Sequence, residues 1–378
     1  MLPSIRHFAR FLEEGGFPDR ATNSVGKSIP SDGLFLPFAW YYRDKERFAN
    51  GDGLDIGHDK FWKNAAHCVI LHHRFQAIAE RLQQSNIPVL LLKGIRIAQA
   101  LYPSPGLRAM ADLDILVRPR DLECACIAIE ALGWRPEQKA ADSPALKRWP
   151  GRDMGQVAEI AFRDPRGHLL EVHWHLVPYV WQRRLIHVGM DAVWREAVPL
   201  PSSVYAGGLE LSPSHTLAYL CIHQALHGLA HLKGFLDIDL FVRKIQSNGG
   251  WDWDRLAACC REWRAGSAAF HALTFSRALF GTPVPAAVLQ ALDPGPVSRH
   301  AVSALLRPWD LLAGGYPCFG LRNPSFVNAA LADRWRDLAS LALRLVFPPP
   351  GWLQYRYGEN ASLPVHWRHI WGFVKRGR

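Results

Sequence analysis

The sequence predicts an α+β protein with a small α/β core, in which a mixed β-sheet domain is flanked by helical segments on both sides. Three observations predict this class. Short apolar runs alternate with helical patterns over residues 87–174, residues 59–84 carry apolar side chains at helical spacing, and only helical patterns remain after about residue 210. We expect three parts: a mostly helical N-terminal segment at 1–85, a sheet domain at 86–205 and a helical C-terminal domain at 206–378.

Each part has its own expected elements. The N-terminal part holds a short helix at 5–14 and a long one at 59–84 that ends at Ser85-Asn86. For the sheet domain we predict strands at 87–92, 112–117, 157–162 and 168–174, the last two forming a hairpin, and helices at 94–101 and 119–132. For the C-terminal domain we predict helices at 214–232, 235–246, 253–263, 267–279, 297–312, 328–345 and 365–375.

Composition excludes several classes of protein. Hydrophobic residues make up 49% of the chain, which excludes a wholly disordered protein. The apolar runs, such as Ile87–Leu92, are too short to span a membrane, and Met1–Glu14 does not read as a secretory signal. Seven Cys without a CxxC pair argue against a disulfide framework or a zinc ribbon, so we expect a cytoplasmic protein. The diffuse net charge of +10 suits an anionic ligand such as a nucleotide, and a nucleic-acid partner is possible but not indicated.

The most informative residues are two acidic ones on a predicted strand. Asp112 and Asp114 are two apart, so their side chains project from the same face, and Leu113 and Ile115 project from the other. Neighbouring carboxylates repel each other, and a cation such as Mg²⁺ or Mn²⁺ is the usual reason to place them together. Glu171, on a later apolar strand, is the best candidate for a third carboxylate in a metal site.

Basic residues surround this acidic pair in the sequence. Lys93 and Gly94 lie between the first predicted strand and its helix, and Arg108 precedes Asp112 by four residues. A glycine at such a turn lets backbone amides approach a phosphate, and lysine and arginine supply the positive charge that a triphosphate requires. An Asp-x-Asp pattern alone equally fits a solvated surface strand, but these flanking residues favour a nucleotide site.

The segment LLLKGIRIAQALYPSPGLRAMADLDILVRPRDLECACIAIEALGWRP, followed by LLEVHWHL, resembles the uncharacterised nucleotidyltransferase family of bacteria, a divergent branch of the DNA polymerase β-like superfamily. The resemblance covers residues 87–176 closely and the following helical region loosely. It implies Asp112, Asp114 and Glu171 as metal ligands, and a nucleotide phosphate site around Lys93, Gly94 and Arg108. The chain departs from the superfamily at this turn, where Lys93-Gly94 replaces Gly-Gly or Gly-Ser.

Histidines supply further candidates. His215, His223, His227 and His231 recur at steps of four or eight residues, which on one helix would place them on one face. We expect His223 and His227 to line the nucleotide or acceptor pocket rather than to bind zinc, because the pattern lacks the glutamate of a hydrolytic zinc motif. His173 shares a strand face with Glu171 and is a further candidate for the pocket wall.

The main hypothesis is therefore a Mg²⁺- or Mn²⁺-dependent enzyme that moves a nucleoside monophosphate from a nucleoside triphosphate, ATP among them, to an acceptor. Pyrophosphate would leave, and the acceptor could be a small molecule, a peptide or a protein. Two alternatives remain. A glycosyltransferase could use Asp-x-Asp to hold a nucleotide sugar, although such folds place several βα units before that motif. A non-catalytic nucleotide-binding protein would explain why no serine follows the first strand.

Overall fold

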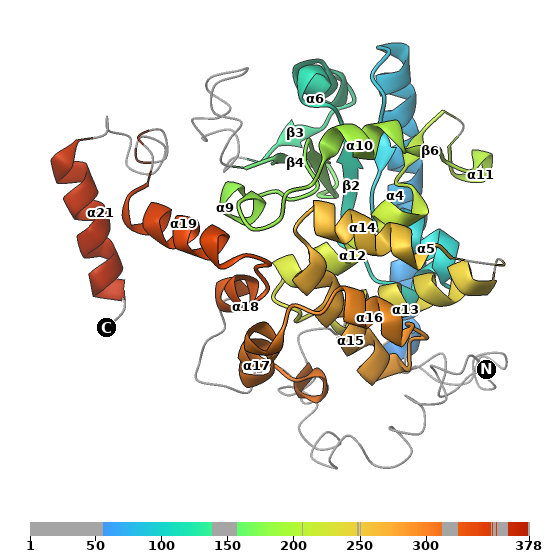
Figure 1. Ribbon diagram of the computed structural model, residues 1–378. Helices are drawn as coiled ribbons and strands as arrows, with labels where there is room; N and C mark the ends of the chain where they lie inside the picture. Colours follow the sequence, from blue (N-terminus) through green and yellow to red (C-terminus); the bar gives the residue numbers. More distant parts are fainter. Residues whose placement is uncertain are drawn as a thin grey trace.

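The computed structural model describes residues 56–137, 157–205, 207–247, 249, 251–311, 324–348, 350, 353 and 362–376 (Figure 1). The predicted helix at 5–14 and most of the N-terminal segment lie outside these residues. The described part is a mixed β-sheet with helices on both faces, so the predicted α+β class is confirmed. None of the described helices is both long enough and apolar enough to cross a membrane.

The described strands form one seven-stranded sheet in the order β3-β4-β5-β2-β1-β7-β6. β2 runs parallel to β5 and β1 runs parallel to β7, and the other neighbours are antiparallel. The strands are β1 (Leu90–Leu91), β2 (Asp112–Leu116), β3 (Arg135–Pro136), β4 (Glu159–Arg163), β5 (Leu169–His173), β6 (Val198–Pro199) and β7 (Leu209–Glu210).

One face of the sheet packs against α4 (Ile56–Gln84) and α6 (Leu122–Ala131). The alternating apolar residues of β2 point to this side, where Leu113 and Ile115 are fully buried. α4 ends at the predicted place, because Asn86 adopts a left-handed conformation (φ 56°) that stops the helix. Short segments complete this half of the chain: α5 (Ile95–Leu101), η2 (Pro105–Leu107), η3 (Pro119–Asp121), α9 (Val180–Arg183), α10 (Met190–Arg195) and α11 (Ser202–Tyr205).

The opposite face of the sheet is covered by the C-terminal helices, and the two share a hydrophobic core that includes Leu90 and Leu116. Figure 1 shows α12 to α16 gathered below the sheet, with α19 and α21 apart from it at the left of the view. The helices are α12 (Pro213–Leu226), α13 (Leu232–Ser247), α14 (Trp253–Glu262), α15 (Gly266–Phe280), α16 (Ala286–Ala291), α17 (Pro296–Leu305), η4 (Pro308–Leu311), α18 (Pro324–Ala330), α19 (Trp335–Val346) and α21 (Leu363–Arg376).

Several predicted elements differ from the observed ones. The predicted helix at 214–232 is wrong beyond Leu226, because Gly228 and Leu229 adopt left-handed conformations (φ 66° and 57°) and end α12. The predicted helices at 297–312 and 328–345 are each interrupted, after α17 and after α18 respectively. The predicted strand at 87–92 shortens to β1, and β7 lies beyond the predicted domain boundary at residue 205. The three-part division itself stays a prediction.

Candidate active site

Three carboxylates gather on the sheet face that the C-terminal helices cover. β2 places Asp112 and Asp114 on this face because alternate residues of a strand share a side. The parallel register of β2 and β5 sets Glu171 directly opposite Asp114. All three side chains line one cavity of about 530 Å³. The structure therefore brings together the three residues that the sequence singled out as metal ligands.

His173 lies among these carboxylates. Its Nε2 atom is 3.2 Å from Asp114 Oδ1 and 3.5 Å from Glu171 Oε2, and its Nδ1 atom is 3.5 Å from Glu159 Oε2. Burial alone would lower the pKa of His173, but hydrogen bonding to Asp114 and Glu171 outweighs burial and raises the pKa to about 9. The sequence analysis did not predict Glu159 as a site residue. Its position between apolar residues of a predicted strand could have indicated a partly buried carboxylate. Glu159 reaches the site because the antiparallel register pairs it with His173.

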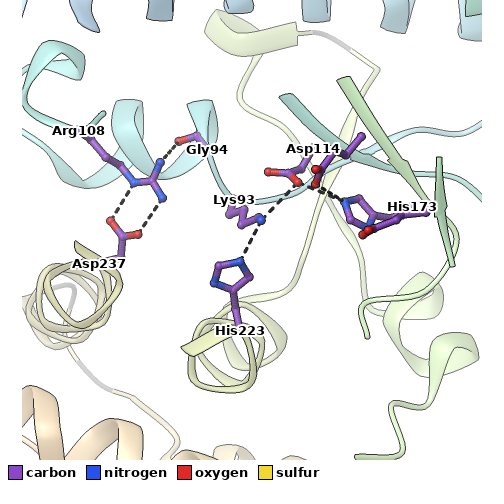
Figure 2. Close-up of polar contacts among 9 residues, drawn as sticks. Lys93, Gly94, Arg108, Asp114, His173, His223 and Asp237 are labelled. Carbon is purple, nitrogen blue, oxygen red and sulfur yellow. Dashed lines mark hydrogen bonds and ion pairs between the residues drawn. The ribbon is translucent and has the colours of Figure 1, made fainter. Parts of the chain in front are cut away.

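Lys93 joins the sheet to α12 (Figure 2). Leu92 N donates to Asp114 O (3.1 Å), which holds the turn after β1 against β2. Lys93 Nζ consequently lies 3.4 Å from Asp114 Oδ1 and 3.0 Å from His223 Nε2. Burial, and then the Lys93 charge, holds the pKa of His223 well below its usual value, so a neutral His223 accepts a hydrogen bond from the Lys93 ammonium.

The pKa values of the two β2 carboxylates shift in opposite directions. The negative charge of Asp114, followed by burial, raises the pKa of Asp112 to about 6. Burial alone would raise the pKa of Asp114, but Lys93 and His173 outweigh burial and hold that pKa below its usual range. Asp114 is therefore the member of the pair that ionises more readily.

The residues present fit a divalent cation. Asp114, Glu171 and His173 each offer one ligand atom, and these atoms lie within 4.8 Å of one another. Asp114 Oδ2 is buried and has no hydrogen-bond partner among the described residues. A buried carboxylate oxygen without a partner is costly, and a metal ion would satisfy it.

Arg108 is buried on the edge of the same cavity and pairs with Asp237 of α13. Its Nε and Nη2 atoms donate to the two carboxylate oxygens at 2.9 and 2.8 Å, and Tyr102 Oη donates to the same group at 2.8 Å. Arg108 Nη1 donates to Gly94 O at 3.3 Å (Figure 2). Three of the five guanidinium N–H groups are thus engaged by protein groups. The sequence indicated Arg108 as a phosphate ligand, and the structure also makes it the link between α13 and the Gly94 turn.

Gly94 makes this turn possible. It adopts φ 60°, a conformation that side chains other than hydrogen disfavour, and a Cβ atom there would lie 3.7 Å from Asp112 O and 3.9 Å from Asp114 Oδ2. The glycine therefore leaves the space beside Asp114 Oδ2 open.

The opposite wall of the cavity comes from α12, α13 and the connection between them. His223, His227 and His231 line it, with ring centroids 4.5 Å apart in the first pair and 4.9 Å in the second. His227 follows the end of α12, so the prediction of a single helix face is wrong. His215 lies elsewhere and stacks on Trp263, with ring centroids 4.9 Å apart.

Lys233 is the second lysine of the cavity and was missed in the sequence. Its Nζ atom donates to Ala109 O at 3.0 Å, and burial, followed by the Arg108 charge, lowers its pKa to about 8. Its position four residues before Asp237 on α13 was a signal, because residues at that spacing share a helix face.

Comparison with known proteins decides the family. A sequence model described as "uncharacterised nucleotidyltransferase" matches residues 60–281, more than half of the chain. The chain belongs to this uncharacterised nucleotidyltransferase family. The enzyme is accordingly a transferase of nucleotidyl groups, and the resemblance noted in the sequence is confirmed.

Among solved structures, the nucleotidyltransferase is similar to the antibiotic-resistance factor ANT(2'')-Ia, with 13% identity, a TM-score of 0.34 and coverage of 56% of this chain and 98% of the other. It is also similar to an antigenic nucleotidyltransferase-like protein from Paracoccidioides brasiliensis, with 14% identity, a TM-score of 0.30 and coverage of 53% and 92%. No curated protein sequence matches the chain.

Proposed function

We propose that the protein is a Mg²⁺- or Mn²⁺-dependent nucleotidyltransferase that transfers a nucleoside monophosphate from a nucleoside triphosphate such as ATP to an acceptor hydroxyl, amine or phosphate. The acceptor would belong to a small molecule, a peptide or a protein. The observation that carries this proposal is the convergence of Asp112, Asp114 and Glu171 on one sheet face. They line a cavity that Lys93 and Lys233 also line. The free thiols of the described cysteines support a cytoplasmic location.

Asp112, Asp114 and Glu171 would hold the metal. When bound, a divalent cation neutralises phosphate charge and makes the α-phosphorus more electrophilic. Lys93, Lys233, the Gly94 turn and the remaining N–H groups of Arg108 would bind the triphosphate.

The acceptor atom would attack the α-phosphorus, and the bond from that phosphorus to the oxygen bridging to the β-phosphate would break. Glu171, half-buried at the cavity, would take the acceptor proton. Pyrophosphate leaves with additional negative charge, which Lys93 and Lys233 would offset. His223 and His227 would form the wall against which the nucleotide or acceptor packs.

The affinity for a nucleoside triphosphate is expected to depend on the metal. A non-hydrolysable triphosphate analogue should bind about tenfold or more tightly with Mg²⁺ or Mn²⁺ than with a chelator, because without the metal three carboxylates repel the phosphates. Titration calorimetry under both conditions measures the difference. Equal affinities would contradict a metal-mediated site, and metal-dependent binding without turnover on any acceptor would indicate a non-catalytic nucleotide-binding protein.

Lys233→Met is expected to weaken triphosphate binding by roughly 10- to 100-fold, because it removes a charge-assisted contact of about 1.5–3 kcal/mol. Lys244→Met is the matched control: Lys244 lies on the same helix, is exposed, and donates to Ala100 O instead of facing this cavity. Calorimetry with the same analogue and metal measures both variants. Equal affinity in the two variants would remove Lys233 from the triphosphate site.

A further inference from the structure

His173 is more than part of the cavity wall, because both nitrogens of its ring lie near carboxylates. It is 4% exposed, and each of its ring nitrogens faces a carboxylate group from a different strand. We propose that His173 is itself a metal ligand, beside Asp114 and Glu171 and oriented by Glu159, and that the site therefore selects Mn²⁺ or another transition-metal ion over Mg²⁺. This inference rests on the proposed function, because it assigns a further ligand to the same metal site.

The spacing of the ligand atoms supports this assignment. Two ligand atoms that bind one ion at about 2.1 Å and at a right angle lie about 3.0 Å apart. His173 Nε2 is 3.2 Å from Asp114 Oδ1 and 3.5 Å from Glu171 Oε2. The three side chains therefore need only small shifts to surround one ion.

The other side of the imidazole ring has the partner that a metal-binding histidine requires. Ligating histidines donate their second ring N–H to a carboxylate, a backbone carbonyl or a water, which fixes the tautomer and the orientation of the ring. Glu159 Oε2 lies 3.5 Å from His173 Nδ1, and the pairing of β4 with β5 holds it there. His173 Nδ1 has no hydrogen-bond partner among the described residues, so Glu159 is the carboxylate placed to accept its N–H after a small shift.

A second interpretation uses the same contacts. His173 could be a protonated counter-ion that neutralises the carboxylates and excludes a metal from Nε2. Lys93, however, already places a positive charge 3.4 Å from Asp114 Oδ1. Asp114 Oδ2 still has no hydrogen-bond partner among the described residues, which the counter-ion interpretation leaves unexplained.

The chemistry of the donors predicts the metal preference. Carboxylates alone suit Mg²⁺, whereas imidazole favours first-row transition metals, and Mn²⁺ accepts both nitrogen and oxygen ligands. A site that adds one imidazole to these carboxylates should therefore discriminate against Mg²⁺ more than the carboxylates alone would. Loss of the imidazole should remove most of that discrimination.

Pulsed electron paramagnetic resonance of the full chain loaded with Mn²⁺ tests this proposal without any acceptor. The wild type is expected to show hyperfine coupling to a directly bound imidazole nitrogen, which His173→Gln should abolish while Mn²⁺ still binds. His168→Gln is the matched control, since His168 lies just before β5 and contacts a carboxylate, Asp164, outside the cavity. That variant should keep the coupling.

Competition between Mn²⁺ and Mg²⁺ supplies the second measurement. The wild type should prefer Mn²⁺, and His173→Gln should reduce the ratio of the two affinities by about tenfold or more. Glu159→Gln should lower the Mn²⁺ affinity by about 10- to 100-fold with the nitrogen coupling retained, and Glu159→Asp should restore part of the affinity. These Glu159 variants test the proposal even if His173→Gln does not fold.

The outcomes separate this proposal from the proposed function. Wild-type Mn²⁺ binding without nitrogen coupling, or coupling that persists in His173→Gln, would overturn the role of His173 and leave the carboxylate site intact. The absence of any Mn²⁺ or Mg²⁺ binding would overturn both.

Discussion

Replacing Asp114 by Asn is expected to slow nucleotidyl transfer by about 100-fold or more, the largest effect on activity among the single substitutions considered. Asp114 is 1% exposed and lies at the centre of the site, in contact with Lys93 and His173 and opposite Glu171. The amide keeps the shape of the side chain but removes the negative charge that would hold the metal. If the metal supplies several kcal/mol of charge stabilisation, the loss amounts to at least two orders of magnitude in rate.

Pyrophosphate release from a nucleoside triphosphate measures this effect, and Asp191→Asn is the matched control because Asp191 is exposed on α10, outside the cavity. The fold of Asp114→Asn should persist, since Asp112 and Glu171 remain to balance Lys93 and since repulsion between the two β2 carboxylates is relieved. Thermal unfolding checks this point. A rate equal to that of Asp191→Asn would contradict a catalytic metal at Asp114.

Local patterns in the sequence predicted which acidic residues lie together in the structure. The alternation of residues 112–117 is a property of one strand, so it showed that Asp112 and Asp114 share a face without any knowledge of the neighbouring strands. The apolar neighbours of Glu171 likewise indicated a carboxylate drawn partly into the protein, and its side chain is 25% exposed. The parallel pairing that sets Glu171 against Asp114 joins segments far apart in the chain, and only the structure shows it.

The remaining site residues depend on tertiary contacts that periodicity does not encode. Lys233 enters the cavity because α12 ends at Leu226 and Lys233 belongs to the first turn of α13, whereas the sequence predicted a first helix that continues to residue 232 and a second that starts only at residue 235. Glu159 becomes a site residue only through its register with His173. The two-residue strands β3, β6 and β7 were also missed, since so short a segment is a strand only by virtue of its neighbours.

The pairing of Arg108 with Asp237 leads to the largest expected effect on stability. Arg108→Ala should lower the free energy of unfolding by about 3–5 kcal/mol, because it leaves the carboxylate of Asp237, which is 2% exposed, without its cation. Tyr102 would remain as a hydrogen-bond donor to that carboxylate. Denaturant titration of wild type and variant measures the difference.

The comparison with an exposed pair isolates the effect of burial. Arg163→Ala removes an ion pair with Glu137 at the surface, and its cost should not exceed about 1 kcal/mol. If Asp237→Asn is introduced together with Arg108→Ala, part of the lost stability should return, since the unpaired buried charge is then gone. A cost for Arg108→Ala no larger than that for Arg163→Ala would show that the buried pair does not stabilise the fold. A well-folded Arg108→Ala variant with weakened triphosphate binding would instead assign the guanidinium mainly to the phosphates, because its loss would then be felt only when the ligand is present.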